Sequence, residues 1–450
     1  MNMSRPANIS PISVIVLIAT LAPVALLGIF VSPALGGCLY ALVFIALTCF
    51  RPDLAFLVMF AAAPCMWDVG GGPVKLAISD ISVVLALPIL ALRKLMISPR
   101  LASNPVRAPI WTYLGVCILS IIANQVPEGS LVSMLQMLVD LVVVAFVFSS
   151  CIEGPEQMRP AFWGLIVMDS IFSVVALMNR SDYIMGLHKN ALGAVLSYGI
   201  LIGTELWFAE ASRRRSKMLL TILLCILSAA LVQSLSRGAW LGTAVGLFFI
   251  MAVRRQFHLM FKVFVILLPV VFLCWMTLPA QSRQYAADFG ADSPSTAARL
   301  NSIDFSWKHF QSSPVIGVGV GLRKMYDSTN LAMSTLAETG IVGLLSFVWI
   351  FFSFFRMILR GRRLLDNSDP LLSFLSIGAA LTACSFVHGL VDFYWVRGML
   401  PVWAAMGMAV FAFNRSQQSR HAKRCSTYAI SRLCPPQRTL PYSGSVVRSN

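Results

Sequence analysis

Residues 218–253 read MLLTILLCILSAALVQSLSRGAWLGTAVGLFFIMAV, two apolar runs separated by a short polar stretch. Arg237 carries the only charge in these residues. Each run, 218–233 and 238–253, approaches the length of about 20 residues that an α-helix needs to cross the hydrocarbon core of a bilayer. The pattern predicts two membrane-spanning helices joined by a short connection, with Arg237 at a membrane surface.

Apolar runs of this kind recur along the whole chain. Of its 450 residues, 58% are hydrophobic and 12% are charged, whereas soluble domains are about 25% charged. The sequence therefore predicts an all-α, polytopic integral membrane protein of about 12–14 transmembrane helices, with residues 1–413 as its membrane domain. The predicted spans are 11–31, 34–50, 53–66, 80–92, 108–124, 132–151, 160–178, 190–208, 218–233, 238–253, 262–278, 334–355, 371–389 and 398–413.

The basic residues predict the orientation. A net charge of +16 would also suit a nucleic-acid partner, but in a membrane protein it is typical of cytoplasmic segments, so we expect no nucleic acid. With the N-terminus in the cytoplasm and alternating spans, 25 of the 35 Lys and Arg residues are cytoplasmic. Arg237 and the large polar loop 279–333 are then periplasmic. The tail 414–450, with seven basic and no acidic residues, is cytoplasmic and predicted to be disordered.

The same alternation brings other polar residues to the periplasmic ends of the predicted helices: His188, Asn190, Ser236, His388 and Asp392. Arg237 differs from the other basic residues at these ends because no acidic residue lies within fifteen positions of it. Arginine stays charged, and its planar fork matches phosphate oxygens. Since ionisable groups near a membrane interior are usually functional, Arg237 is the leading candidate for substrate binding.

Several of these positions also have a purely structural interpretation. Lys189 and Arg397 are able to snorkel toward lipid headgroups. Asp80 precedes an apolar run and suits a helix N-cap. His388, within an apolar stretch, suits a packed core histidine as well as a catalytic base.

The loop 279–333 contains two further features. Residues 295–310 predict a helix with Trp307 and Phe310 on an apolar face, which suits a position on the bilayer surface, and Arg299 lies in its first turns. Glycine then occupies alternate positions at Gly317, Gly319 and Gly321. Because the spacing matches neither GxGxxG nor a P-loop, we interpret this stretch as a tight backbone turn close to the substrate.

Three stretches, taken in order, resemble the O-antigen ligase and polymerase family of bacterial envelopes over residues 180–345. They are HKNALGAVLS at 188–197, SLSRGAWLG at 234–242, and the loop end, RLNSIDFSWKHFQSSPVIGVGVG at 299–321 with TNLAMSTLAETGIVGLL at 329–345. The resemblance implies a metal-independent glycosyltransferase without a cofactor. Such enzymes act at the periplasmic face of the inner membrane on undecaprenyl-diphosphate-linked oligosaccharides.

Carried over to this chain, the resemblance assigns roles to individual residues. Arg237 would hold the diphosphate and Arg299 would be a second candidate for that role, while His188 and Asn190 would line the pocket. The chain departs from the family at Thr329, where ligases carry the histidine thought to activate the acceptor. Threonine is no base near neutral pH, so either another group acts as the base or the acceptor is not the lipopolysaccharide core. The leading substitutes for the base are His188, His388, Asp392 and Glu338, and His309 in the loop helix is a weaker one. The catalytic candidates are therefore Arg237, His188 and His388, and the substrate-binding candidates are Arg299, Asn190, Ser236, Gly317, Gly319, Asn330, Glu338 and Asp392.

The missing histidine favours a polymerase, which joins repeat units into an exopolysaccharide or O-antigen chain. A ligase that transfers the glycan to another acceptor is the alternative, and a polysaccharide transporter or flippase is the alternative of another class. Partners would be the lipid-linked oligosaccharide, the bilayer and other assembly proteins such as a flippase or a chain-length regulator. The sequence shows no internal repeat of the kind that transporters often contain.

Overall fold

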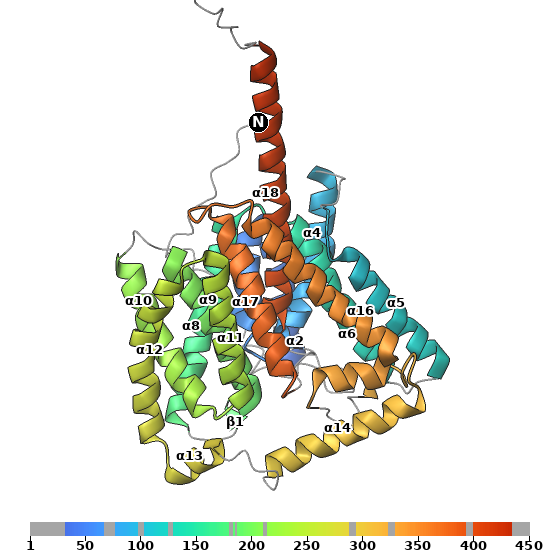
Figure 1. The fold of residues 1–450 in the computed structure, drawn as a ribbon, viewed down its shortest axis with the longest axis vertical. Coiled ribbons are helices and arrows are strands. Elements are labelled where there is room, and N and C mark those ends of the chain that lie inside the picture. The colour runs from blue at the N-terminus through green and yellow to red at the C-terminus, as the bar shows by residue number, and fades with distance from the viewer. Residues whose placement is uncertain are drawn as a thin grey trace, which may run out of the picture.

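The computed structural model shows a bundle of helices in which a few long helices form the centre (Figure 1). It describes residues 32–66, 77–97, 103–124, 129–179, 183–184, 187–209, 214–287, 294–322, 329–392 and 399–433. The predicted span 11–31 lies outside these residues. Every other predicted span coincides with a helical segment, so the all-α membrane fold is confirmed.

The elements follow one another along the chain as α2 (Pro33–Phe50), α3 (Pro52–Ala62), α4 (Ile78–Ile97), α5 (Arg107–Asn124), α6 (Gly129–Val142), the π-helical turn η1 (Val143–Val147), α7 (Phe148–Ser150), α8 (Pro155–Met178), the antiparallel strands β1 (Tyr183–Ile184) and β2 (Leu187–His188), α9 (Lys189–Ala209), α10 (Arg214–Gln233), α11 (Arg237–Arg254), α12 (Phe257–Thr277), α13 (Ala280–Ala287), α14 (Pro294–Ser312), α16 (Leu331–Arg362), α17 (Leu371–Gly389) and α18 (Leu400–Leu433). Among the described residues, eight segments are long and apolar enough to cross a membrane. The helices α2 and α3 are shorter and apolar. The protein is therefore an integral membrane protein, and the total of 12–14 spans remains a prediction.

The helices α9, α11 and α17 form the centre of the bundle through small residues at their contacts. A β-carbon added to Gly242 of α11 would lie 2.8 Å from the backbone oxygen of Cys384 in α17. One added to Gly378 of α17 would lie 2.9 Å from the backbone oxygen of Ala405 in α18. Because lipid tails are as apolar as leucine side chains, this close backbone approach is a main source of helix association in a membrane.

A buried ion pair links the C-terminal ends of α9 and α11. Glu205 of α9 is fully buried, and both of its carboxylate oxygens accept the Nε–H of Arg254 in α11 at 2.9 Å. Ser376 of α17 donates to the same carboxylate at 2.7 Å. The two charges are paired and hydrogen-bonded, which is the condition under which charged groups are tolerated inside a membrane protein.

The loop 279–333 contributes α13 and α14, which lie across one end of the bundle (Figure 1). We call this the loop end. The predicted helix 295–310 is confirmed as α14, Pro294–Ser312. The side chains of Leu300 and Trp307 are 54% and 44% exposed, so part of its apolar surface faces away from the protein.

The tail does not begin as predicted. Instead of becoming disordered at residue 414, α18 continues to Leu433 and projects from the bundle at the end opposite α14 (Figure 1). The physical reason is that residues 414–433 contain neither glycine nor proline, and the first proline is Pro435. With no helix breaker present, the helix of the last span extends into the polar sequence.

Candidate functional site

The turn between α10 and α11 positions Arg237 as the first residue of α11. Leu235 adopts the left-handed region, with φ of 53°, which costs a residue with a β-carbon about 1–2 kcal/mol. Ser234 Oγ holds this conformation because it accepts the backbone N–H of Ser236 at 3.3 Å and donates to the Leu231 carbonyl at 2.7 Å. Ser236 makes no side-chain cap hydrogen bond to α11. The strained turn thus presents a guanidinium at a helix N-terminus, where backbone N–H groups attract anions.

The end of α17 packs directly against this turn. A β-carbon at Gly238 would lie 2.7 Å from His388 Cδ2 and 2.5 Å from Val391 Cγ2, so only glycine fits there. His388 is 3% exposed. Asp392 follows one turn later, with its backbone N–H donating to the His388 carbonyl at 2.9 Å. Gly238 therefore brings the predicted base His388 beside the residue that follows Arg237.

The loop also brings a second cation, Arg299, into electrostatic range of His388. Arg299 of α14 lies close enough to His388 for its positive charge to act on the imidazole ring. Asn330, at the start of α16, donates from its side chain to the Leu390 carbonyl at 2.7 Å. The backbone N–H of Thr329 donates to Ser302 Oγ of α14 at 2.9 Å. These contacts join α14 and the start of α16 to the end of α17.

The start of α9 completes this group of helix ends. A β-carbon at Gly193 would lie 2.9 Å from Ser236 Cβ, which places the beginning of α9 against the Arg237 turn. His188 Nδ1 accepts the backbone N–H of Asn190 at 3.5 Å, and both side chains are partly buried. Lys189 lies over the Tyr285 ring of α13, with Nζ 4.5 Å from the ring centroid. Lys189 therefore makes a specific contact with the loop, which the snorkelling interpretation does not include.

Together these contacts assemble a cationic site from four helix ends and the loop. Its residues are His188, Asn190, Ser236, Arg237, Arg299, Asn330, His388 and Asp392. Eight predicted site residues, up to 204 positions apart (188–392), thus gather at the loop end. Their assignment to substrate or catalysis remains a prediction.

Gly317, Gly319 and Glu338 lie in a different arrangement, around a break in α16. Gly340, with φ of 65° and ψ of −169°, divides α16 into helical segments at 331–339 and 341–362. Loop residues 314–321 replace the hydrogen bonds that the break removes. The Ile341 N–H donates to the Pro314 carbonyl at 3.0 Å, and the Gly319 N–H donates to the Glu338 carbonyl at 3.1 Å. We call this set of contacts the clasp.

Two glycines allow the clasp to form, because backbone lies against backbone at both. A β-carbon at Gly317 would lie 2.3 Å from the carbonyl carbon of Glu338, and one at Gly340 would lie 2.3 Å from that of Val315. Both glycines have positive φ. The Glu338 side chain also takes part, since its Oε1 accepts the Gly321 N–H at 3.0 Å. The glycine-rich stretch is a tight turn, as predicted, and its partner in these contacts is α16.

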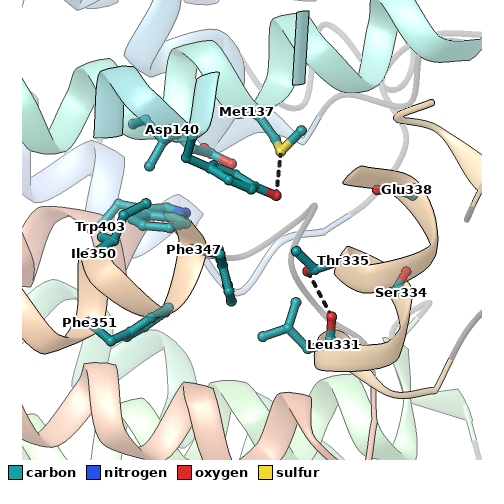
Figure 2. A pocket seen from close by; sticks show the side chains of 12 residues that line it. Met137, Asp140, Leu331, Ser334, Thr335, Glu338, Phe347, Ile350, Phe351 and Trp403 are labelled. Carbon is teal, nitrogen blue, oxygen red and sulfur yellow. Dashed lines mark hydrogen bonds between the residues drawn. The ribbon is translucent and has the colours of Figure 1, made fainter. Parts of the chain in front are cut away.

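A pocket of about 540 Å³, including space open to solvent, lies inside the bend of α16 (Figure 2). The first segment of α16 lines it with Leu331, Ser334, Thr335 and Glu338, and the second lines it with Phe347, Ile350 and Phe351. The spacings i, i+3, i+4 and i+7 in the first segment and i, i+3 and i+4 in the second show that each segment turns one face to the pocket. Tyr113 of α5, Met137, Asp140 and Leu141 of α6, and Trp403 of α18 form the remaining walls.

Three carboxylates inside predicted spans escaped the sequence analysis. Asp140 lines the pocket, Glu205 pairs with Arg254, and Asp169 of α8 is fully buried against Gly199. A lone acidic residue in an apolar run is the signal that would have found all three, since such residues are rarely there without a role. Each contact joins residues too far apart in sequence for spacing to reveal it.

Two other predicted positions have separate outcomes. Asp80 Oδ2 accepts the Ala77 N–H at 2.9 Å, so it caps the start of α4 from inside the first turn. The N-cap interpretation of Asp80 is therefore wrong, because α4 begins at Ile78 and Asp80 lies in its first turn, from which its carboxylate reaches back to the N–H that precedes the helix. Arg397 lies outside the described residues. Within the described ranges, no group of three or more His, Cys, Asp or Glu side chains is arranged to hold a metal ion.

Residues 220–348 match the family model described as O-antigen ligase. No curated protein matches the chain. The matched segment begins in α10 and ends in the second half of α16. It therefore contains Arg237, Arg299, the clasp and the break at Gly340. Over this segment the chain is similar to the O-antigen ligase family.

Proposed function

We propose that the protein is a membrane glycosyltransferase that polymerises undecaprenyl-diphosphate-linked oligosaccharide repeats at the periplasmic face of the bacterial inner membrane. The observation that carries the proposal is the packing of the Arg237 turn against His388 at the loop end of the bundle, within electrostatic range of Arg299. The family match supports a ligase or polymerase type of glycosyl transfer.

The cationic site suits a diphosphate leaving group. When the anomeric carbon–oxygen bond breaks, negative charge develops on the departing lipid diphosphate. Arg237 and the N-terminus of α11 supply a guanidinium fork and backbone N–H groups to that charge. Groups that are already fixed in place stabilise such a transition state strongly, because they need no reorganisation as the charge forms. The proposed reaction therefore requires no metal.

The acceptor hydroxyl must lose a proton as the new glycosidic bond forms. We assign the base to His388 or His188, because imidazole is the side chain whose ordinary pKa lies nearest to neutral pH. The oxygen of the acceptor attacks the anomeric carbon, its proton passes to the imidazole, and the diphosphate leaves with the bonding electron pair. Direct displacement of this kind inverts the anomeric centre.

Thr329 supports a polymerase in preference to a ligase. Its backbone N–H and its hydroxyl both donate to Ser302 Oγ of α14, at 2.9 and 3.4 Å. A residue held in this way positions the start of α16, whereas the ligase residue at this place is thought to activate the acceptor. A ligase that uses a different base is the second candidate, since the matched family carries the ligase description.

The lipid-linked intermediates in a deletion strain test the proposal. A polymerase defect leaves single repeats on the surface acceptor or on the lipid carrier. Full-length chains that remain on the carrier would instead identify a ligase. Accumulation of single repeats on the cytoplasmic leaflet would identify a flippase and contradict glycosyl transfer by this protein.

A further inference from the structure

Two consecutive residues, Thr329 and Asn330, connect α14 with the end of α17. The backbone N–H of Thr329 donates to Ser302 Oγ of α14 at 2.9 Å. The side chain of Asn330 donates to the Leu390 carbonyl, at the end of α17, at 2.7 Å. We call these two hydrogen bonds the tie. Because they act in series, a break in either one disconnects α14 from α17 along this route.

The tie reaches both helices next to charged groups of the cationic site. Ser302 follows Arg299 by three positions in α14, so the two side chains lie on the same face of that helix. Leu390 follows His388 by two positions and comes directly after the last residue of α17. Arg299 is within electrostatic range of His388. The tie therefore joins the two helices close to the residues whose charges act on one another.

Both ends of the Asn330 amide are engaged within the protein. Its Oδ1 accepts the Met333 N–H at 3.0 Å and so caps the start of α16, while its Nδ2 donates to the Leu390 carbonyl. The carbonyls at a helix C-terminus have no partner inside the helix, so Asn330 supplies a donor where one is needed. Exchanging the amide oxygen and nitrogen would break both contacts, which fixes the orientation of the amide. These contacts give Asn330 a role that needs no substrate, unlike the substrate-binding role predicted from the sequence.

The other link of the tie is enclosed by the protein. Ser302 is 1% exposed, so its hydroxyl is closed off from a substrate. The Thr329 N–H depends on this hydroxyl as its acceptor, and the side-chain hydroxyl of Thr329 adds only a longer contact of 3.4 Å to the same atom. A donor that loses its acceptor in such surroundings is costly to leave unpaired. Removing the Ser302 hydroxyl therefore favours a shift of α14 relative to the start of α16.

We propose that Ser302 and Asn330 are positioning residues of the proposed transfer reaction, which set the place of Arg299 relative to His388 without touching the substrate. The inference rests on the proposed function, because that reaction uses these two groups. A displacement of about 1 Å is able to lower the rate of an enzyme roughly a hundredfold. In the proposed mechanism, Arg237 and the N-terminus of α11 bind the diphosphate, and the tie does not contact either. A broken tie should therefore lower kcat and leave the KM for the lipid-linked donor nearly unchanged.

Two variants break the tie at its two links. Ser302→Ala removes the acceptor of the Thr329 N–H. Asn330→Ser keeps a good N-cap for α16 and is too short to reach the Leu390 carbonyl. Both are assayed as purified full-length protein in lipid nanodiscs with lipid-linked repeats as the substrate. Each should lower kcat about tenfold or more, with KM within about twofold of the wild-type value.

The double variant of Ser302→Ala and Asn330→Ser tests whether the two bonds act together. Because they act in series, its kcat should be about as low as that of either single variant, whereas independent effects would multiply to roughly a hundredfold or more. Ser312→Ala is the matched control, because this hydroxyl of α14 donates to the His309 carbonyl of its own helix at 2.7 Å. It should keep wild-type kcat. Amide hydrogen exchange of α14 tests the tie without any reaction, and it should be faster in both tie variants than in the control.

The outcomes separate this inference from the proposed function. If the wild-type protein transfers glycan and both tie variants keep its kcat, the inference fails and the proposed function stands. A raised KM in Asn330→Ser alone, or effects that multiply in the double variant, would assign Asn330 to the substrate and also overturn the inference. Unchanged exchange of α14 in both variants would show that the tie does not hold this helix. A wild-type protein that transfers no glycan would refute the proposed function and the inference with it. If one variant does not accumulate, the other still decides through its kcat, its KM and the exchange of α14.

Discussion

Arg237 occupies a position that a merely structural arginine does not need. It follows a left-handed Leu235, begins α11, and precedes a glycine whose missing side chain makes room for His388. Strained backbone of this kind persists where the surroundings enforce it, and it occurs often at functional sites. The geometry thus supports a role for this guanidinium in binding a charged group.

Replacing Arg237 tests that role. Arg237→Ala should lower the rate of polymer formation by roughly a hundred- to thousandfold, which corresponds to about 2.7–4 kcal/mol of transition-state stabilisation. Arg237→Lys should also be severely impaired, because lysine restores the charge without the two-pronged fork. Polymer length on gels is measured beside the abundance of the protein in membranes.

Lys308→Ala, which removes an exposed cation of α14 at the same end of the bundle, is the control and should keep wild-type polymer. If Arg237 only reaches toward lipid headgroups, Lys will be fully tolerated and Ala will mainly lower abundance. Wild-type polymer from Arg237→Ala at normal abundance would refute the diphosphate assignment.

A second prediction at this scale concerns the base. Thr329→Ala should retain substantial activity, because the backbone N–H that bonds to Ser302 is unchanged and only the longer hydroxyl contact of 3.4 Å is lost. At least one of His188→Ala and His388→Ala should be inactive while still accumulating. Polymer synthesis in membranes with measured protein content gives the comparison. An inactive Thr329→Ala beside two fully active histidine variants would contradict our account of this position.

Among the elements, α16 has the most unusual construction. Its two segments meet at Gly340, and the clasp repairs the hydrogen bonds that a continuous helix would have made for itself. Asn124 of α5 adds a side-chain hydrogen bond to the Gly317 carbonyl at 2.9 Å, and Ser120 adds one to the Glu338 carbonyl at 2.7 Å. The bend is therefore held from outside the helix, and it creates the space that becomes the pocket.

Gly340→Ala should destabilise the protein by about 2 kcal/mol or more. With φ of 65° and ψ of −169°, Gly340 has a backbone conformation that is essentially restricted to glycine and costs a residue with a β-carbon about 1–3 kcal/mol. The added atom would also overlap the backbone of Val315. Thermal unfolding in detergent should show a lower midpoint. The control is Gly115→Ala in α5, where a β-carbon would meet nothing within 4 Å. That variant should be neutral or slightly stabilised, as expected for a glycine inside a helix. Equal midpoints for the two variants would contradict the role of the clasp.

For the whole molecule, the arrangement separates two ends. The α14 end carries the cationic site, and the other end carries the long projection of α18. The distribution of Lys and Arg residues predicts that α14 is periplasmic and α18 reaches the cytoplasm. The proposed reaction depends on that orientation.

Labelling in intact cells tests the orientation. In a background without native cysteines, a cysteine at Lys308 of α14 should react with an impermeant maleimide, because this side chain is 70% exposed. A cysteine at Arg420 of α18 should react only after the cells are permeabilised. The opposite pattern would reverse the topology and place the cationic site on the wrong side for a periplasmic polymerase.

The sequence predicts the fold well because each membrane span is a local property. Runs such as 371–389 and 190–208 need only their own apolar residues to become α17 and α9. The extension of α18 also has a local signal, because residues 414–433 contain neither glycine nor proline. The polar composition of that segment predicts disorder, but the absence of helix breakers determines the structure.

The residues of the site also differ in whether a local signal in the sequence reveals them. Arg237 stands out locally, since it is a lone charge between two apolar runs. The contacts of Gly340 and Glu205 have no local signal in the sequence, because Val315 precedes Gly340 by 25 positions and Arg254 follows Glu205 by 49. Only the folded chain brings such residues together. The pocket depends on four helices and on a bend held by a loop, so no single stretch of sequence predicts it.

The clasp also has a consequence for how this sequence is able to change over generations. The room beside Gly317 is filled by the backbone of α16, and the room beside Gly340 is filled by the backbone of the loop. A side chain at either position would meet main-chain atoms, and a substitution at a neighbouring position changes only side-chain atoms. Compensating mutations are thus unavailable, and the two glycines form one inherited unit. Relatives that keep the bend should carry both glycines, and a lineage that loses one should be released from the other.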